Sequence, residues 1–289
     1  MTKGKKILFI AAGVIFVTLA VLFFFYDLEI SKLLVQDKPY FIFTLLAAIG
    51  EFPIYIGPVL FGLVYGFIIE NKCLKISSFL VGLIGVYVAS IRLSQGIYEN
   101  FFNSELGLLK YSLLAVASLF IYVLLYMVFN KMSLEKIGKL KDLALLSFVV
   151  SISSFAMITI IKHIWGRPRY YQIKDDLTQF SNYLTIHGFN NSRMGNGYLS
   201  FPSGHTNSAS CIMILPFIFN RITNKKWVNI VSTIISYSYI ALVGVSRICL
   251  GAHFASDVLF GFGINCVCFT ITYIILKKKG WLHVRSNKC

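Results

Sequence analysis

Long apolar runs recur from one end of this sequence to the other. The first, Ile7–Tyr26, has Thr18 as its only clearly polar interior residue. A helix needs about 20 apolar residues to cross the roughly 30 Å of hydrocarbon in a bilayer. Only 13% of the residues are charged and 57% are hydrophobic, whereas soluble domains carry about 25% charge. These properties exclude a soluble or a disordered chain and predict membrane-spanning helices. Further spans are predicted at Ile76–Gln95, Leu108–Phe129, Leu143–Ile164, Gly204–Asn220, Val228–Cys249 and Phe254–Leu276.

One more span is predicted within Phe41–Ile69, which is too long for a single crossing. Glu51 and Pro53 interrupt it, and proline tends to kink or start a helix because it lacks a backbone donor. We expect an interfacial piece before Glu51 and a span after it. The predicted fold class is therefore all-α, a polytopic membrane helix bundle of about eight transmembrane helices. The first is expected to be an uncleaved anchor, because its run is too long for a signal peptide and lacks a small-x-small cleavage site.

The charged residues are unevenly distributed between the two faces that these spans define. The chain has 27 Lys and Arg against 12 Asp and Glu, and its net charge is +15. With an even number of spans both termini share one face. That face holds most of the basic residues, including Lys277–Lys279, but few of the acidic ones. Because basic loops stay in the cytoplasm, both termini are expected to be cytoplasmic. The basic excess is thus a topology signal, and no nucleic acid partner is expected.

Three segments carry polar and charged residues at positions where hydrophobicity should dominate. The first, Lys162–Tyr170, closes the fifth predicted span. The second, Phe201–His205, opens the sixth. The third runs from Ser246 to Asp257 and joins the seventh span to the eighth. Counting spans therefore puts all three segments on one face, which is the outer, extracytoplasmic one.

Several residues of these segments suit a phosphate group. Lys162, Arg169 and Arg247 are fixed cations, and the planar fork of arginine matches phosphate oxygens well. Ser203 and Gly204 stand at a predicted helix start, where free backbone N–H groups and the positive end of the helix dipole favour an anion. Gly204 also lets a ligand approach the backbone closely. The segments therefore predict a binding site for an oxyanion.

Two histidines can supply the chemistry at such a site. His253 and Asp257 are four residues apart, which places them on one helical face. The carboxylate can hold one ring nitrogen and leave the other free as a nucleophile. His205 is a second imidazole that can act as a general acid toward a leaving alkoxide. Together with the cations, they predict phosphoryl transfer. A metal is less expected, because Asp257 is the only carboxylate in the set and Mg²⁺ sites are rich in oxygen ligands.

The three segments resemble the motifs of the type 2 phosphatidic acid phosphatase family, the membrane lipid-phosphate phosphatases whose pocket is similar to that of vanadium haloperoxidases. The family patterns are K-x6-R-P, P-S-G-H and S-R-x5-H-x3-D. The resemblance covers the chain from Lys162 to Asp257, and Tyr170 stands where the first pattern has proline. The family core has six spans, so the resemblance implies that two of the first four spans here are additions. The matching residues are Lys162 and Arg169, then Pro202, Ser203, Gly204 and His205, then Ser246, Arg247, His253 and Asp257.

The resemblance implies a role for each matching residue. His253 would attack phosphorus and form a phosphohistidine, which water then hydrolyses. Asp257 would orient His253, and His205 would protonate the leaving oxygen. The family needs no metal, so the resemblance implies no cofactor and no metal ligand. Lys162, Arg169, Ser203, Gly204 through its N–H, and Arg247 would hold the phosphate and its transition state.

These inferences predict an integral membrane phosphatase acting on a lipid phosphate or diphosphate. Candidate substrates are phosphatidate, phosphatidylglycerophosphate and a polyprenyl diphosphate such as undecaprenyl diphosphate. Two alternatives stay open, a lipid phosphotransferase that uses the same site and a transporter without chemistry. Membrane lipids are the expected partners, and the oligomeric state is undetermined. The predicted organisation is an N-terminal transmembrane region at 1–140, a phosphatase core at 141–280 and a cytoplasmic tail at 281–289.

Three charged residues outside the matched pattern receive other interpretations. Glu51, beside Pro53, is read as a helix-start residue, since acidic side chains favour that position. Arg92 is expected to extend its side chain from the outer end of the third span to the membrane surface. Arg167 lies within the first segment but off the pattern, and its role stays open.

Overall fold

The computed structural model describes residues 3–36, 38–102, 107–189, 195–223 and 225–281. Within these ranges the regular structure is entirely helical. Seven of the described helices are long and apolar enough to cross a membrane. The expected all-α polytopic membrane bundle is confirmed.

The first half of the chain forms four of the seven candidate spans. The break at Glu51 occurs as expected, and η1 and α3 follow it without a gap. By length and composition the candidate span runs through the break, over Phe41–Ile68, so the interfacial placement of the piece before Glu51 stays a prediction. The elements are α1 (Lys3–Leu34), α2 (Phe41–Ile49), the 3₁₀ turn η1 (Phe52–Tyr55), α3 (Ile56–Ile68), α4 (Lys72–Ile97), the π-helical turn η2 (Tyr98–Phe102) and α5 (Leu108–Asn130).

The second half carries the three motif segments. It contains α6 (Leu134–Gly138), α7 (Lys141–Trp165), α8 (Tyr170–Ile173), η3 (Leu177–Gln179), η5 (Asn196–Tyr198), α9 (Gly204–Ser210), η6 (Cys211–Ile214), α10 (Leu215–Ile222), α11 (Lys226–Cys249) and α12 (Ala255–Lys278).

The sixth expected span, Gly204–Asn220, is built from three pieces rather than one helix. It passes through α9, the 3₁₀ segment η6 and α10, and it is not among the seven candidate spans. Pro216 near the start of α10 lacks a backbone donor, and α9 buries polar side chains such as Asn207 and Ser208. The prediction of a single uniform helix over Gly204–Asn220 was therefore wrong.

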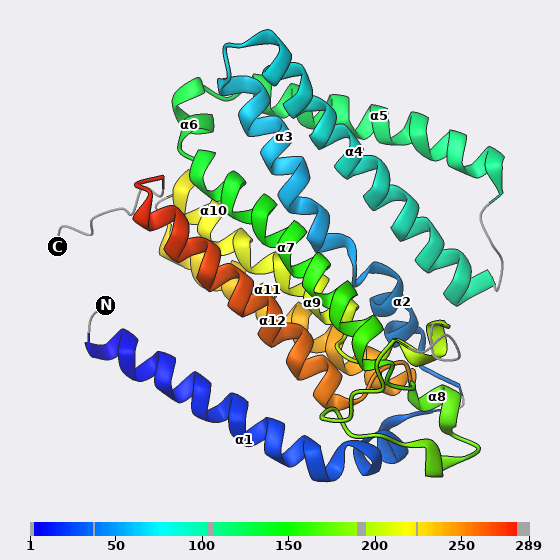
Figure 1. The fold of residues 1–289 in the computed structure, drawn as a ribbon. Helices are drawn as coiled ribbons and strands as arrows, with labels where there is room; N and C mark the ends of the chain where they lie inside the picture. Colours follow the sequence, from blue (N-terminus) through cyan, green and yellow to red (C-terminus); the bar gives the residue numbers. More distant parts are fainter. Residues whose placement is uncertain (1–2, 37, 103–106, 190–194, 224, 282–289) are drawn as a thin grey trace.

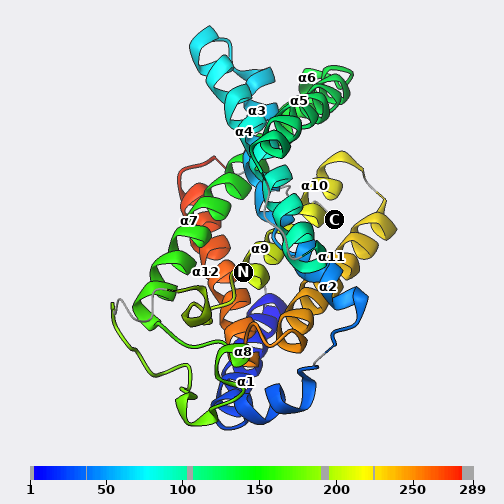
Figure 2. The same ribbon diagram turned by 90° about the vertical axis from the view of Figure 1, so that its right-hand side faces the viewer.

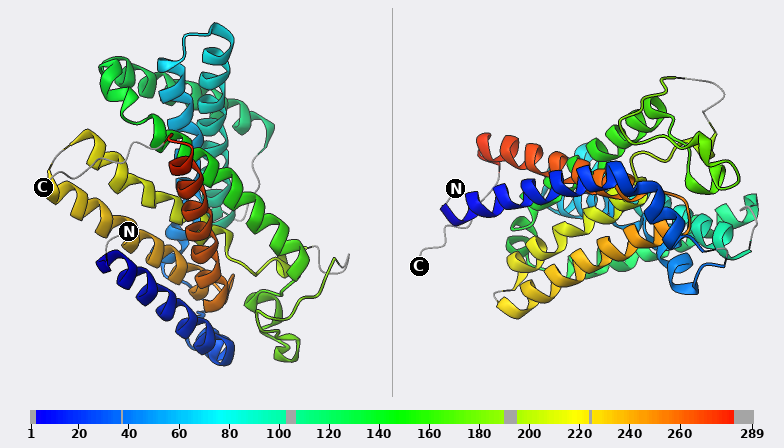
Figure 3. Two further views of the ribbon diagram at one scale, coloured as in Figure 1. Left: turned by 60° about the vertical axis from the view of Figure 1, so that its left-hand side comes forward. Right: turned by 90° about the horizontal axis from the view of Figure 1, so that it is seen from below.

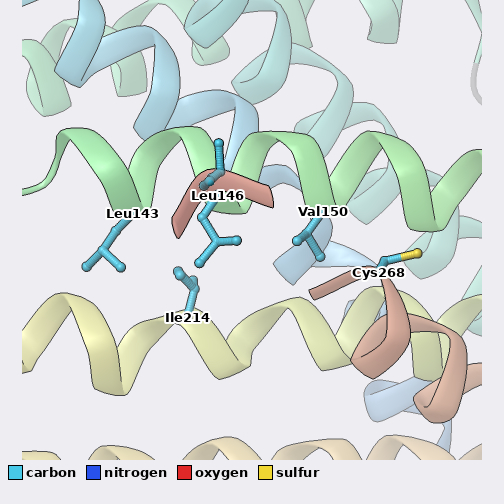
Figure 4. Close-up of a cluster of buried hydrophobic side chains, with 6 residues drawn as sticks. Leu143, Leu146, Val150, Ile214 and Cys268 are labelled. Atoms are coloured by element: carbon cyan, nitrogen blue, oxygen red, sulfur yellow. The ribbon is translucent and has the colours of Figure 1, made fainter. Parts of the chain in front are cut away.

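The core of the bundle lies where α7 meets α12 and the α9–α10 segment. Leu143, Leu146 and Val150 of α7 are buried against Ile214 and Cys268 (Figure 4). Burying one such aliphatic side chain contributes about 1.5–3 kcal/mol in water, but between lipid-exposed helices close packing matters more. The segment that bears the second motif is thus fixed between the helices that bear the other two.

A second packing layer joins α3 to α4. A methyl group on Gly62 would lie 2.4 Å from Cα of Gly82, so the two backbones approach closely, as small residues permit in membranes. Figure 2 shows α3–α6 extending to one side of the bundle, with α1 on the other. Both groups of helices therefore flank the α7, α9–α12 core.

The two ends of the bundle differ in content. The loops that follow α7 and α11 gather at one end, together with α8 and α2 (Figure 1). The beginning of α1 and the end of α12 lie at the opposite end (Figure 3). All three motif segments are thus brought to the same end, the arrangement that counting spans predicted.

Candidate active site

The first motif segment is shaped by the end of α7. Gly166 terminates this helix in the left-handed region, with φ 57°, and its N–H bonds to the carbonyl of Lys162. A glycine at this C-terminal position carries no steric penalty. Pro168 follows and cannot continue the helix. Lys162 therefore lies in the last turn of α7, while Arg169 follows the turn as the N-cap of α8.

The second motif segment begins α9. Ser203 is the N-cap, and its hydroxyl accepts a hydrogen bond from the N–H of Thr206 over 3.3 Å. The backbone N–H of Ser203 donates to the carbonyl of Asp257 over 2.9 Å. Ser203 is fully buried, so its side chain caps the helix instead of facing solvent. This cap fixes the direction in which Gly204 and His205 leave the turn.

The third motif segment is a tight turn between α11 and α12. The carbonyl of Arg247 accepts N–H bonds from Ala252 and His253, and Gly251 takes a φ of 64° that favours glycine. Asp257 stands in the first turn of α12 and accepts the N–H of Phe254 over 2.8 Å. A carboxylate at this position satisfies a free backbone donor and suits the helix dipole.

These three segments surround one cavity of about 370 Å³. Both histidines and all three cations of the motifs line this cavity. Ser203 and Asp257 are buried and do not line it. Its lining residues are Ala47, Ala48, Glu51, Arg92, Gln95, Gly96, Glu99, Lys162, Arg169, Asn196, Leu199, Gly204, His205, Arg247 and His253.

His253 and Asp257 face each other as the sequence predicts. Nδ1 of His253 lies 3.7 Å from Oδ2 of Asp257, and the two side chains are 1% and 0% exposed. This separation is longer than a hydrogen bond, although catalytic hydrogen bonds often tighten only in the complex with substrate. Because Nδ1 is directed at the carboxylate, Nε2 is the ring nitrogen available to the cavity.

The surroundings of His253 favour its neutral form. Burial lowers the pKa of His253 well below its ordinary value, and the charges of Lys162, Arg169 and Arg247 lower it further, whereas Asp257 opposes the shift. A neutral imidazole has the free electron pair that a nucleophile needs. The site thus holds His253 in its reactive protonation state.

The cations of the site differ in how they are held. Lys162 donates to the carbonyl of Leu199, and Nη2 of Arg169 donates to Oδ1 of Asn196 over 2.8 Å. Within the described ranges, nothing accepts a hydrogen bond from the buried Nε atoms of Arg169 and Arg247. Buried donors of this kind normally find a partner, so an anion in the cavity is a fitting acceptor.

The structure places Arg167, whose role the sequence left open, beside Asp257 and away from the cavity. It is 0% exposed and does not line the cavity. Nη1 donates to Oδ1 of Asp257 over 2.6 Å, and Nη2 donates to Oδ2 of Asp27 over 2.9 Å. The guanidinium also lies 4.2 Å above the ring of Phe254. Arg167 therefore fixes the carboxylate behind His253.

Two acidic residues at this site were missed by the sequence analysis. Asp27 continues α1 beyond the predicted end at Tyr26 and accepts from Arg167 and from the N–H of Ser256. An acidic side chain so near an apolar span is a signal for function in membrane helices. Glu51 does stand at a helix start, as the N-cap of η1, but the sequence did not show that it also lines the cavity, with Oε1 3.4 Å from Nδ1 of His205.

The helix α4 supplies a further wall of the cavity. Arg92, Gln95 and Glu99 line it from this helix. Arg92 was expected to reach the membrane surface, and the sequence offered no signal that it shares a cavity with the motifs. Within the described ranges, no three His, Cys, Asp or Glu side chains gather as a metal site would require.

The second half of the chain is similar to a known protein family. Residues 143–281 match the model of the PAP2 superfamily. This stretch belongs to the PAP2 superfamily. The PAP2 domain spans α7 to α12 and includes the three motif segments. Asp27, Glu51 and Arg92 lie outside it, although all three contribute to the site.

A curated relative agrees with this family. The chain is 40% identical to phosphatidylglycerophosphatase B of Bacillus subtilis (strain 168) over 76 residues, which are 24% of this chain and 36% of the relative. The matched part thus covers about a third of that protein's length. No solved structure matches. The family match begins at residue 143, so the helices before α7 lie outside it.

Proposed function

We propose that this protein is an integral membrane phosphatase that removes phosphate from a lipid phosphate or a lipid diphosphate. One observation carries the proposal: two imidazoles and three cations line a single cavity at the end of an apolar helix bundle. The cations suit the charge of a phosphate group. The apolar helices suit a substrate whose hydrocarbon chains stay in the membrane.

In the first step, Nε2 of His253 attacks the phosphorus atom. The bond from phosphorus to the leaving oxygen breaks, and His205 gives its proton to that oxygen, so a lipid alcohol or a lipid monophosphate leaves. Lys162, Arg169, Arg247 and the N–H of Gly204 balance the charge on the phosphoryl oxygens. Asp257 holds the other nitrogen of His253 throughout.

In the second step, water hydrolyses the phosphohistidine. His205 is now neutral and takes a proton from the water as its oxygen attacks phosphorus. The phosphorus–nitrogen bond breaks, which frees His253 and releases inorganic phosphate. This cycle needs no metal, because protein side chains supply the positive charge.

The substrate class follows from the site together with the relative. The matched relative is named for phosphatidylglycerophosphate, which ends in a phosphomonoester. Phosphatidate also ends in a phosphomonoester and is a further candidate. Polyprenyl diphosphates, including undecaprenyl diphosphate, are candidates too, although their terminal phosphate is joined through a phosphoanhydride, so that a lipid monophosphate would leave. The direct test is a panel of these lipids given to the detergent-solubilised protein. Release of inorganic phosphate from at least one of them supports the proposal, and release from none contradicts it.

We further propose that the cavity opens on the extracytoplasmic side of the cell membrane, with both termini in the cytoplasm. The excess of basic residues at the opposite end supports this orientation. Two exposed positions test it, Asp175 after α8 at the end of the bundle that holds the site and Lys136 in α6 at the other end. In a chain with Cys73 and Cys289 replaced by serine, an impermeant thiol reagent should label Asp175→Cys in intact cells and Lys136→Cys only after permeabilisation. The reverse pattern would overturn the orientation.

A further inference from the structure

The carboxylate of Glu51 lies beside the second catalytic candidate, His205. Oε1 of Glu51 is 3.4 Å from Nδ1 of His205, and the two side chains are 32% and 23% exposed. Both residues line the same cavity. They come from distant parts of the chain, since Glu51 follows α2 and His205 belongs to α9. The fold therefore builds this contact, and no motif spacing encodes it.

Glu51 is held in place by its backbone and not by a capping bond. It is the N-cap of η1, yet its side chain makes no capping hydrogen bond there. The preceding residue, Gly50, packs tightly: a Cβ on Gly50 would lie 2.9 Å from Cγ1 of Val243 and 3.5 Å from Cδ2 of His205. The turn after α2 thus lies next to the imidazole, with the Glu51 carboxylate on the side of Nδ1.

The charges around His205 make this contact important. Arg247, Arg169 and Lys162 carry positive charge near the ring and repel a protonated imidazole. A general acid must nevertheless carry a proton when the leaving group departs. A carboxylate within about 4 Å favours the charged imidazole and offsets the repulsion. The facing groups are Glu51 from the α2–η1 turn, Lys162 from α7, Arg169 before α8, Arg247 from α11 and His253 before α12, while Arg92 and Glu99 of α4 line the same cavity.

We propose that Glu51 is a positioning residue that accepts the Nδ1–H of His205 and keeps this histidine protonated for its role as general acid. The inference rests on the proposed phosphatase function and deepens it. Glu51 would serve His205 as Asp257 serves His253, with each carboxylate fixing one imidazole. The proton on Nε2 of His205 moves to the leaving oxygen as the phosphorus–oxygen bond breaks, while Nδ1 keeps its proton and its bond to Glu51. Because Glu51 lies outside residues 143–281, the helices before the PAP2 domain complete the site.

The test compares leaving groups in the first step, because only a poor one needs the proton there. Release of the leaving group is measured in a single turnover, from a lipid phosphate and from p-nitrophenyl phosphate, whose leaving group departs without protonation; the later hydrolysis uses His205 with either substrate and is thereby kept out of the measurement. Glu51→Gln should lower the single-turnover rate on the lipid phosphate by about 10²-fold and that on p-nitrophenyl phosphate by less than about threefold. The alkaline limb of kcat/KM should move to lower pH by about one unit. Glu51→Asp should restore part of the rate.

Three further variants make the result decisive. His205→Ala alone should lose as much as the double variant Glu51→Gln/His205→Ala, because Glu51 acts through the ring. Glu29→Gln, which removes the exposed carboxylate of the Glu29–Lys32 pair on α1, should keep the wild-type rate. Three results would each show that the inference is wrong while the phosphatase function stands. Glu51→Gln could lower the rate on both substrates equally, it could leave the alkaline limb of kcat/KM in place, or its loss of rate could add to that of His205→Ala. If the wild type releases no phosphate from any lipid, both fall.

Discussion

Nη2 of Arg167 lies 2.9 Å from Oδ2 of Asp27, and neither side chain is exposed. The pair connects α1 with the turn that follows α7. The other arm of the same guanidinium reaches Oδ1 of Asp257 over 2.6 Å. Through this chain of contacts the first helix, which lies outside the PAP2 domain, supports the carboxylate that faces His253. A buried charge pair of this kind is costly to break, because one charge is then left without a partner.

Replacing one member of the pair should therefore loosen the site. We expect Asp27→Asn to lower the free energy of unfolding by about 2 kcal/mol, since it weakens charged hydrogen bonds to Arg167 and Ser256, and to reduce kcat. The unfolding temperature in detergent and the rate of phosphate release check this. Glu29→Gln on the same helix serves as the control, because Glu29 is exposed. An Asp27→Asn protein that melts and turns over like the wild type would contradict the support role of α1.

The motif residues were predictable because their chemistry is local. Lys162 and Arg169 lie on either side of a turn, and Gly166 and Pro168 make this turn predictable from the sequence. His253 and Asp257 are four residues apart, a spacing that brings side chains to one helical face. Counting apolar spans was enough to bring the three segments to one end of the bundle. Ser203 is the partial exception: the sequence identified its helix start, while the hydroxyl is used to cap α9.

The supporting residues could not be predicted in the same way. Asp27 and Glu51 reach the site through tertiary packing, across sequence separations that no motif spans. The apolar runs that located the helices also concealed their irregularities, so the break in the sixth span was missed. A hydropathy pattern reports how apolar a segment is, and not where a proline such as Pro216 starts a new helical piece.

The pH dependence of the reaction should reflect the burial of His253. Because its pKa lies well below the ordinary value, the imidazole stays neutral and nucleophilic as the pH falls through about 6.5, where exposed histidines are protonated. We expect kcat/KM, which reports the free enzyme, to show no loss from His253 protonation at that pH. The result would contradict a neutral His253 if kcat/KM fell on the acid side with a midpoint at or above about pH 6.5 and the titration of the substrate did not account for this fall.

The same shift has a consequence for stability. The unfolded chain protonates His253 near its ordinary pKa, whereas the folded protein does so only at lower pH. The unfolded state therefore binds more protons below about 6.5, and this contribution to stability is lost as the pH falls. His253→Gln should remove that part of the pH dependence. Unfolding temperatures of the two proteins across pH 5–8 (about the histidine range) check the sign, and equal slopes would contradict it.

Removal of divalent metals should leave the activity intact. Lys162, Arg169 and Arg247 supply positive charge to the cavity, and Asp257 already accepts from Arg167, Ser200 and the N–H of Phe254. The carboxylate therefore has little capacity left for a metal ion. Phosphate release after dialysis against EDTA should equal that of untreated protein. A complete loss that Mg²⁺ restores would argue for a metal-dependent reaction.

The central claim is that His253 attacks the phosphate of a lipid in the cavity that it shares with His205. The most direct measurement compares phosphate release by wild-type and His253→Ala protein on the preferred lipid phosphate, with both shown to be folded by their elution and unfolding temperature in detergent. The account predicts that the variant loses activity by at least roughly 10³-fold, as expected for removal of a covalent nucleophile. A folded His253→Ala protein that releases phosphate near the wild-type rate would contradict it.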